Sequence, residues 1–292
     1  MRSAAGMKCN EYAKFPRLEI CNMKLREFFY GIGVKPPARE FEYDVQRFQL
    51  AREGEIQFAA WRHPAEKPKE FAQAHVDALR EFLSPGDFAI DIGAHTGDST
   101  LPIALAVGPA GGVIALEPNP YVFKVLSANA ALNRGKMNIY PFMFAATADD
   151  GRMIFEYSDS GFCNGGKHKN ISAWRHAHFF KLTVQGRNLE KFLKQEHPDL
   201  FSRIRYIKID TEGYDPDVIQ SIPDLLLRNR PFIKTEIYKH LSTERRRSYF
   251  RDLRDLGYRL YKWESDENYY GKVLSENNVA DWRHYDIFAV PE

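Results

Sequence analysis

The sequence predicts an α/β fold built around a mostly parallel sheet. Three observations support this prediction. Short apolar runs alternate with stretches of helical periodicity between residues 71 and 146, the run at 88–94 leads directly into a glycine-containing loop, and the alternation resumes after residue 206. Parallel strands need long crossover connections, usually helices, so this alternation is typical of a parallel sheet with right-handed crossovers.

The first half of the chain contains the clearest alternation. Residues 1–69 have weak periodicity and include a Pro-Pro pair that favours an extended connector, so we place an N-terminal extension there and the main domain at 70–292. Aromatic residues of the extension, among them Phe28, Phe29, Tyr30, Phe41 and Tyr43, are expected to pack against the main domain. The elements that follow are a helix at 71–83, a strand at 88–94, a helix at 99–108 closed by Gly108, a strand at 112–120, a helix at 121–135 ended by Gly135, and a strand at 137–146.

The second half begins with a break in the rhythm. A strand from residue 151 leads into a Gly- and Asn-rich loop up to residue 170, and a strand and a short helix follow at 179–193. The later elements are a strand at 206–213, a helix at 215–229, a strand at 231–237, a helix at 243–258 and a closing antiparallel pair at 259–264 and 284–292.

Composition excludes several classes of protein. The 292 residues are 44% hydrophobic and carry 41 basic and 39 acidic side chains, a balance that does not itself indicate nucleic acid or membrane. Cys9, Cys21 and Cys163 lack the spacing of a disulfide framework or a zinc site, so we expect a cytoplasmic protein. No apolar run approaches the ~18 residues of a membrane span.

The loop after the strand at 88–94 suggests a nucleotide-like ligand. Gly93 and Gly97 are four residues apart, which differs from the G-x-G-x-x-G pattern of dinucleotide sites. This wider turn suits a ligand without phosphates, and Asp91 could face an ammonium group. Glu117, at the end of the next strand, could accept both hydroxyls of a ribose. S-adenosylmethionine, an amino acid joined to adenosine, has this chemistry; the alternative is a tight turn beside a surface acid.

Three segments resemble the motifs of the FkbM family of S-adenosylmethionine-dependent methyltransferases: FAIDIGAHTGDSTL, VIALEPNPYVFKVLSANAALN and YIKIDTEGYDPDVIQSI. The resemblance runs from about residue 88 to the carboxyl end. It implies a class I methyltransferase (Rossmann-like) fold, with a seven-stranded mostly parallel sheet and helices on both faces, and methylation of a hydroxyl on a sugar, glycan or small metabolite.

The resemblance also implies a set of cofactor-binding residues. Asp91, Gly93, Ala94, His95, Thr96 and Gly97 would surround the methionine part of the cofactor, Glu117 would hold the ribose, and the adenine would lie near Ala146. His95 stands where the family often has Asn or a small polar residue.

Acids at the ends of two later strands are the candidates for catalysis. Asp210 and Glu212 follow one strand and Glu236 ends the next, at the sheet edge where ligands of α/β folds gather. Asp210 is the favoured general base, with Glu212 and His95 as further catalytic candidates. Asp210 and Glu236 could instead bind Mg²⁺. A third interpretation is structural, in which Glu212 caps the next helix and Asp210 orders the loop.

Two other features leave alternatives open. Asn164 or His168, in the Gly-rich loop, could contact substrate. The basic helix at 243–258 could indicate a nucleic-acid methyltransferase, but interleaved acids are typical of a solvated helix face, so no nucleic-acid partner is expected. A non-catalytic binding protein that keeps the fold is the remaining alternative.

Overall fold

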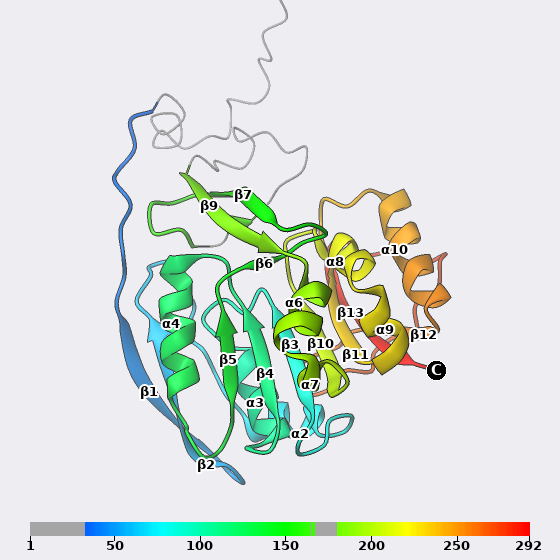
Figure 1. Ribbon diagram of the computed structural model, residues 1–292, viewed down its shortest axis with the longest axis horizontal. Coiled ribbons are helices and arrows are strands. Elements are labelled where there is room, and N and C mark those ends of the chain that lie inside the picture. The colour runs from blue at the N-terminus through cyan, green and yellow to red at the C-terminus, as the bar shows by residue number, and fades with distance from the viewer. Residues whose placement is uncertain (1–32, 164, 167–179) are drawn as a thin grey trace, which may run out of the picture.

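The computed structural model describes residues 33–163, 165–166 and 180–292 (Figure 1). Asn164 and His168 lie outside the described residues, as do Phe28, Phe29 and Tyr30. No helix within the described ranges is both long and apolar enough to cross a bilayer.

A seven-stranded sheet forms the centre of the molecule, in the order β12-β13-β11-β10-β3-β4-β5. Its strands are β3 (Phe88–Ile92), β4 (Gly112–Leu116), β5 (Ile139–Phe142), β10 (Ile204–Ile209), β11 (Phe232–Ile237), β12 (Tyr258–Lys262) and β13 (Tyr285–Pro291). The five strands from β5 to β11 are parallel, whereas β13 is antiparallel to both of its neighbours. The predicted antiparallel closing pair is confirmed, but β13 inserts between β11 and β12 and leaves β12 at the edge.

Helices cover both faces of this sheet, as predicted (Figure 1). Successive strand residues point to opposite faces. On one face Ile90 packs with α6 (Leu189–Glu196), α8 (Asp215–Ser221), α9 (Pro223–Asn229) and α10 (Thr243–Asp255). On the other, Ala89 packs with α2 (Gln73–Leu79) and α3 (Thr100–Val107). The remaining helices of the described residues are α4 (Pro120–Ala131) and the short α7 (Pro198–Phe201).

Two predicted elements are each divided in the structure. The helix expected at 215–229 is two helices, because Pro223 starts α9 and cannot donate the hydrogen bond that would continue α8. The strand expected at 137–146 ends at Phe142, and Ala145–Ala146 forms β6 in another sheet, where it pairs with Gly186 and Arg187.

A second, four-stranded sheet lies over the carboxyl ends of β3, β4 and β5 (Figure 1). Its order is β6-β9-β7-β8, with β7 (Gly151–Tyr157), β8 (Gly165–Gly166) and β9 (Phe180–Arg187). Met153 and Phe155 of β7 face the same cavity as the end of β4. The break in rhythm seen in the sequence therefore corresponds to a sheet that covers the ligand-binding edge of the main one.

The described part of the predicted extension packs into the main domain. β1 (Tyr43–Leu50) and β2 (Gly54–Trp61) form an antiparallel hairpin whose Ile56 and Phe58 are fully buried in the core that includes α2 and α3. The Asn129 side chain of α4 accepts from the Ala59 backbone N–H at 2.6 Å and donates to its carbonyl oxygen at 3.1 Å. The hairpin is thus an integral layer of the fold.

Candidate active site

The loop after β3 depends on two glycines with positive φ, +78° at Gly93 and +96° at Gly97. A Cβ atom at Gly93 would lie 2.0 Å from the Asp210 carbonyl oxygen, and one at Gly97 would lie 3.1 Å from Leu126 Cδ1. Glycine at position 93 therefore lets the loop contact the end of β10 directly.

Asp91 lies behind this loop and is fully buried. Its Oδ2 accepts hydrogen bonds from the hydroxyls of Ser99 and Thr100, both at 2.7 Å, and its Oδ1 from Lys208 Nζ at 3.2 Å. Burial would lower the pKa of Lys208, but the charges of Asp91 and Asp210 raise it well above its usual range. The ammonium that Asp91 faces is thus that of Lys208, and this geometry favours a positioning role for Asp91 over direct contact with a ligand.

Glu117 is held at the end of β4 with its carboxylate fixed by backbone donors. Oε2 accepts from the His95 N–H at 3.1 Å and Oε1 from the Asn119 N–H at 2.8 Å. Burial raises the pKa of Glu117 to about 7, although both backbone hydrogen bonds lower it. A buried acid fixed in this way can still accept hydrogen bonds from ligand hydroxyls.

A cavity of about 80 Å³ lies at the ends of β3, β4 and β10. The cavity brings together five of the predicted site residues: Gly93, Glu117, Ala146, Asp210 and Glu212. Side chains of β7 line it from the second sheet, and its surface is mainly apolar near β6.

Ala94, Thr96 and Gly97 line neither this cavity nor the larger one described next. Ala94 and Thr96 are fully buried. The Ala94 N–H donates to the Leu116 carbonyl oxygen at 3.0 Å, and the Gly97 N–H to that of Ala94 at 2.8 Å. These buried residues and backbone hydrogen bonds stabilise the loop. Contact of Ala94, Thr96 and Gly97 with a cofactor stays a prediction.

A second cavity, of about 460 Å³, lies between α2, α3 and the sheet. Gly93 and Asp210 line both cavities, so the two meet there. His95, Lys69 and Lys208 contribute polar groups to the second cavity. Burial lowers the pKa of His95, which favours its neutral imidazole form.

The acids after β10 have distinct surroundings. The Asp210 side chain is 51% exposed, and its Oδ2 lies 3.6 Å from Lys208 Nζ. Glu212 has a φ of +56°, and burial, together with the charge of Asp210, raises its pKa. The loop is ordered by Asp215, whose Oδ2 accepts from both the backbone N–H and the hydroxyl of Thr211. No side chain of the described residues caps α8, so a capping role for Glu212 is not observed.

The structure gives no support to the metal site predicted from Glu236 and Asp210. Glu236 is buried and hydrogen-bonded through Oε1 to the His284 ring, while its Oε2 has no hydrogen-bond partner in the described structure. Burial, with the charges of Asp210 and Asp215, raises the pKa of Glu236 to about 10. Because His284 engages one of the two Glu236 oxygens, the geometry gives no support to Mg²⁺ binding by Glu236 and Asp210.

Several residues of the site were missed in the sequence. Lys208 had a signal, a lysine within an apolar strand, whereas His284 and its partner are separated by 48 positions and had none. Glu66, His95 and Cys163 also meet in space although they come from distant segments. Spacing rules cannot detect such clusters because only the tertiary fold brings their members together.

The basic helix α10 is largely engaged within the protein. Arg246 is 5% exposed and donates to backbone carbonyl oxygens, and Arg245 and Arg251 form ion pairs with Asp217 and Glu244. The expectation of a solvated face is therefore wrong for Arg246. These arginines are not arranged as a free basic patch for nucleic acid.

The sheet order with β13 reversed, the glycine loop after β3 and the acid at the end of β4 define a class I methyltransferase fold. The sequence model of the methyltransferase FkbM domain matches residues 91–260, which is more than half of the chain. The chain therefore belongs to the FkbM methyltransferase family, which confirms the family predicted from its motifs.

Similar solved structures include methyltransferase FkbM from Methylobacillus flagellatus KT, with 13% identity and a TM-score of 0.41 over 70% of this chain and 44% of that chain. This chain thus aligns with less than half of the Methylobacillus protein. Fibrillarin from Aeropyrum pernix, with natively bound S-adenosyl-L-methionine, has 14% identity and a TM-score of 0.41 over 85% of this chain and 99% of that chain. The SAM-dependent O-methyltransferase of Thermotoga maritima has 14% identity and a TM-score of 0.41 over 85% of this chain and 77% of that chain. Comparison with curated proteins gave no match.

Proposed function

We propose that this protein is an S-adenosylmethionine-dependent O-methyltransferase that acts on a hydroxyl of a sugar, a glycan or a small metabolite in the cytoplasm. The observation that carries the proposal is the meeting of two cavities at Gly93 and Asp210. One cavity has the acid and the apolar surface that an adenosine needs, and the other is polar. Such an arrangement can hold two reactants with their reacting atoms in contact.

The residues present fit the cofactor. Adenine would lie against the apolar surface at Ala146, and Glu117 would accept hydrogen bonds from the ribose hydroxyls. The methionine part would pass Gly93, where the absence of a side chain lets the loop lie directly against the Asp210 carbonyl oxygen. When bound, S-adenosylmethionine supplies a methyl group on a positively charged sulfur.

The protein's own chemical contribution is to position the acceptor and remove its proton. Asp210 is the best placed base, because it lines both cavities and its carboxylate is half-exposed. It would take the hydroxyl proton as the oxygen bonds to the methyl carbon. Lys208, 3.6 Å away, orients this carboxylate from below. Glu212 and His95 are secondary candidates, each lining one of the cavities.

Methyl transfer itself tests the proposal. The protein is incubated with S-adenosylmethionine and a panel of sugars, glycans and hydroxylated metabolites, and each acceptor is analysed by mass spectrometry. The expected product gains one methyl group on oxygen, and its yield falls sharply in Asp210→Asn. Transfer only to nitrogen or carbon, or to RNA, would contradict the proposal.

A further inference from the structure

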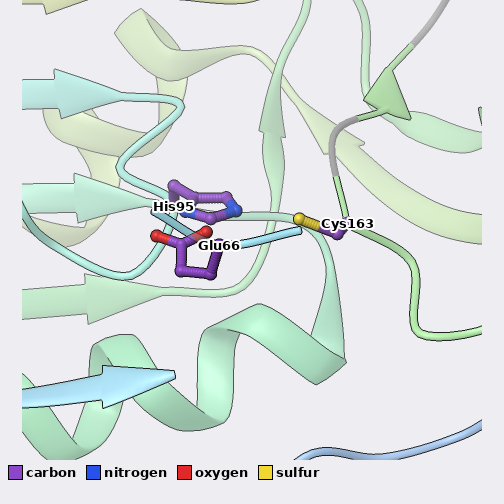
Figure 2. Close-up of side chains that lie close together, drawn as sticks. All are labelled: Glu66, His95 and Cys163. Carbon is purple, nitrogen blue, oxygen red and sulfur yellow. The ribbon is translucent and has the colours of Figure 1, made fainter. Parts of the chain in front are cut away.

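Glu66, His95 and Cys163 form a cluster of potential metal ligands beside the glycine loop. Each offers one ligand atom, and the three atoms lie within 4.8 Å of one another. Figure 2 shows the Cys163 sulfur directed toward the His95 ring and the Glu66 carboxylate. Cys163 is 1% exposed, and Glu66 Oε1 and His95 Nε2 are buried atoms. Among the described residues this is the one such group of three.

The fold holds the three ligands from separate directions. His95 belongs to the loop after β3, and the Trp61 ring at the end of β2 packs edge-on against it at 5.9 Å. Asn119 Nδ2 donates to the Phe162 carbonyl oxygen at 2.6 Å and so anchors the segment that carries Cys163. The backbone segments that carry His95 and Cys163 are therefore held in place by the protein itself.

The environment leaves donors available at the centre of the cluster. His95 Nε2 has no hydrogen-bond partner within the described structure. Glu66 Oε1 forms an ion pair with Lys69 Nζ at 2.6 Å, but Lys69 also pairs with Asp98 at 2.7 Å. Lys69 thus keeps a carboxylate partner if Glu66 turns to another cation, and the second oxygen of Glu66 is available in either case.

The donor set matches zinc. A thiolate, an imidazole and a carboxylate are the three ligand types that Zn²⁺ takes in proteins, with bonds of about 2.0–2.3 Å. Tetrahedral geometry then places the donor atoms about 3.3–3.7 Å apart, so the cluster needs to contract by about 1 Å. This contraction requires rotation of the Glu66 and Cys163 side chains.

We propose that Glu66, His95 and Cys163 bind one Zn²⁺, with a fourth position open to water. The ion would join the segment between β2 and α2, the glycine loop and the segment before β8 into one unit. Because the His95 N–H donates to Glu117, the ion would also hold the loop in the conformation that fixes this acid. Metal binding at this site does not depend on the proposed methyl transfer.

Zinc content and cobalt spectroscopy test the site on the full chain. Cys9→Ser/Cys21→Ser serves as background because it removes the other two thiols of the sequence. The protein is loaded with Zn²⁺, dialysed against metal-free buffer and analysed for metal, and a parallel sample is loaded with Co²⁺. We expect one Zn²⁺ per chain and the charge-transfer absorption of a thiolate bound to Co²⁺.

Variants identify the ligands. Cys163→Ser and His95→Gln are each expected to weaken Zn²⁺ binding by at least about 100-fold, since even the loss of an outer partner costs about 10–100-fold. His197→Gln, a histidine outside the cluster, should bind like the background protein. Thermal unfolding without metal checks that each variant is folded. The absence of bound Zn²⁺ and of the cobalt band in the background protein would overturn the proposal, as would full retention of Zn²⁺ by both ligand variants.

Discussion

Replacement of Glu117 by Gln separates the stability of the fold from its proposed ligand binding. Burial raises the pKa of Glu117 to about 7, whereas an ordinary glutamate titrates at 4.5. Ionised Glu117 is therefore less favourable in the folded chain than in the unfolded chain by about 3 kcal/mol, because a pKa shift of one unit corresponds to about 1.4 kcal/mol. Glutamine keeps the shape without the charge, but its amide nitrogen cannot accept, so one of the two backbone hydrogen bonds from His95 and Asn119 is lost.

The sign of the effect depends on pH. Below pH ~4.5 both states hold a protonated Glu117, so Glu117→Gln is expected to differ from the wild type only by the lost backbone hydrogen bond, about 1 kcal/mol. As the pH rises to about 7 the wild type loses up to about 3 kcal/mol, and above this pH the difference stays constant. The variant is thus expected to be the more stable protein at pH ~8, while its binding of S-adenosylmethionine is weakened.

Urea unfolding across this pH range measures the difference. Glu190→Gln is the matched control, since Glu190 is also a buried acid that accepts from a backbone N–H, that of Leu225, but it lines neither cavity and pairs with Lys194. The control is expected to lose stability through this broken pair. A Glu117→Gln protein that is less stable than wild type at pH ~8, or a difference that does not vary with pH, would refute the reasoning.

Three further substitutions test other parts of the site. In urea unfolding, Gly93→Ala is expected to lose about 1–3 kcal/mol more unfolding free energy than Gly135→Ala. Both glycines have positive φ, but only at Gly93 would the added Cβ lie 2.0 Å from a carbonyl oxygen, that of Asp210. Equal losses would contradict this close contact. Lys208→Met should destabilise the fold by about 3–5 kcal/mol in the same assay, since Asp91 would remain buried without its cation. A loss of less than about 1 kcal/mol would argue against a stabilising Lys208–Asp91 ion pair. Asp210→Asn should lower kcat by about 100-fold or more in a methyl-transfer assay with an unchanged Kd for S-adenosylmethionine; an unchanged kcat would exclude Asp210 as the base.

Local patterns predicted the main sheet well because its strands and helices alternate along the chain. The strand β3 is predicted by its own apolar run, and the end of α3 by Gly108 alone, so neither prediction needs distant parts of the chain. The hairpin of β1 and β2 was not, since its burial depends on α2, α3 and α4, which follow it in the sequence. The division of residues 137–146 likewise depends on pairing with β9, far along the chain.

The sequence predicts those residues of the candidate site that directly follow a strand within a recognisable motif. Gly93, Glu117 and Asp210 were named from the sequence, and the structure places all three on one cavity. The partners of these residues were not predictable. Asp91 gave no indication that its cation would be Lys208, and nothing near Glu236 in the sequence pointed to its histidine partner, because both contacts cross between separate strands or loops.

Isothermal titration of S-adenosylmethionine into the wild type, Glu117→Ala and Glu190→Ala tests the central claim most directly. The account predicts one binding site in the wild type, affinity at least about 10-fold weaker in Glu117→Ala because the ribose hydroxyls lose their acceptor, and unchanged affinity in Glu190→Ala. An absence of binding to the wild type, or equal affinity in the wild type and Glu117→Ala, would contradict a cofactor site at the end of β4.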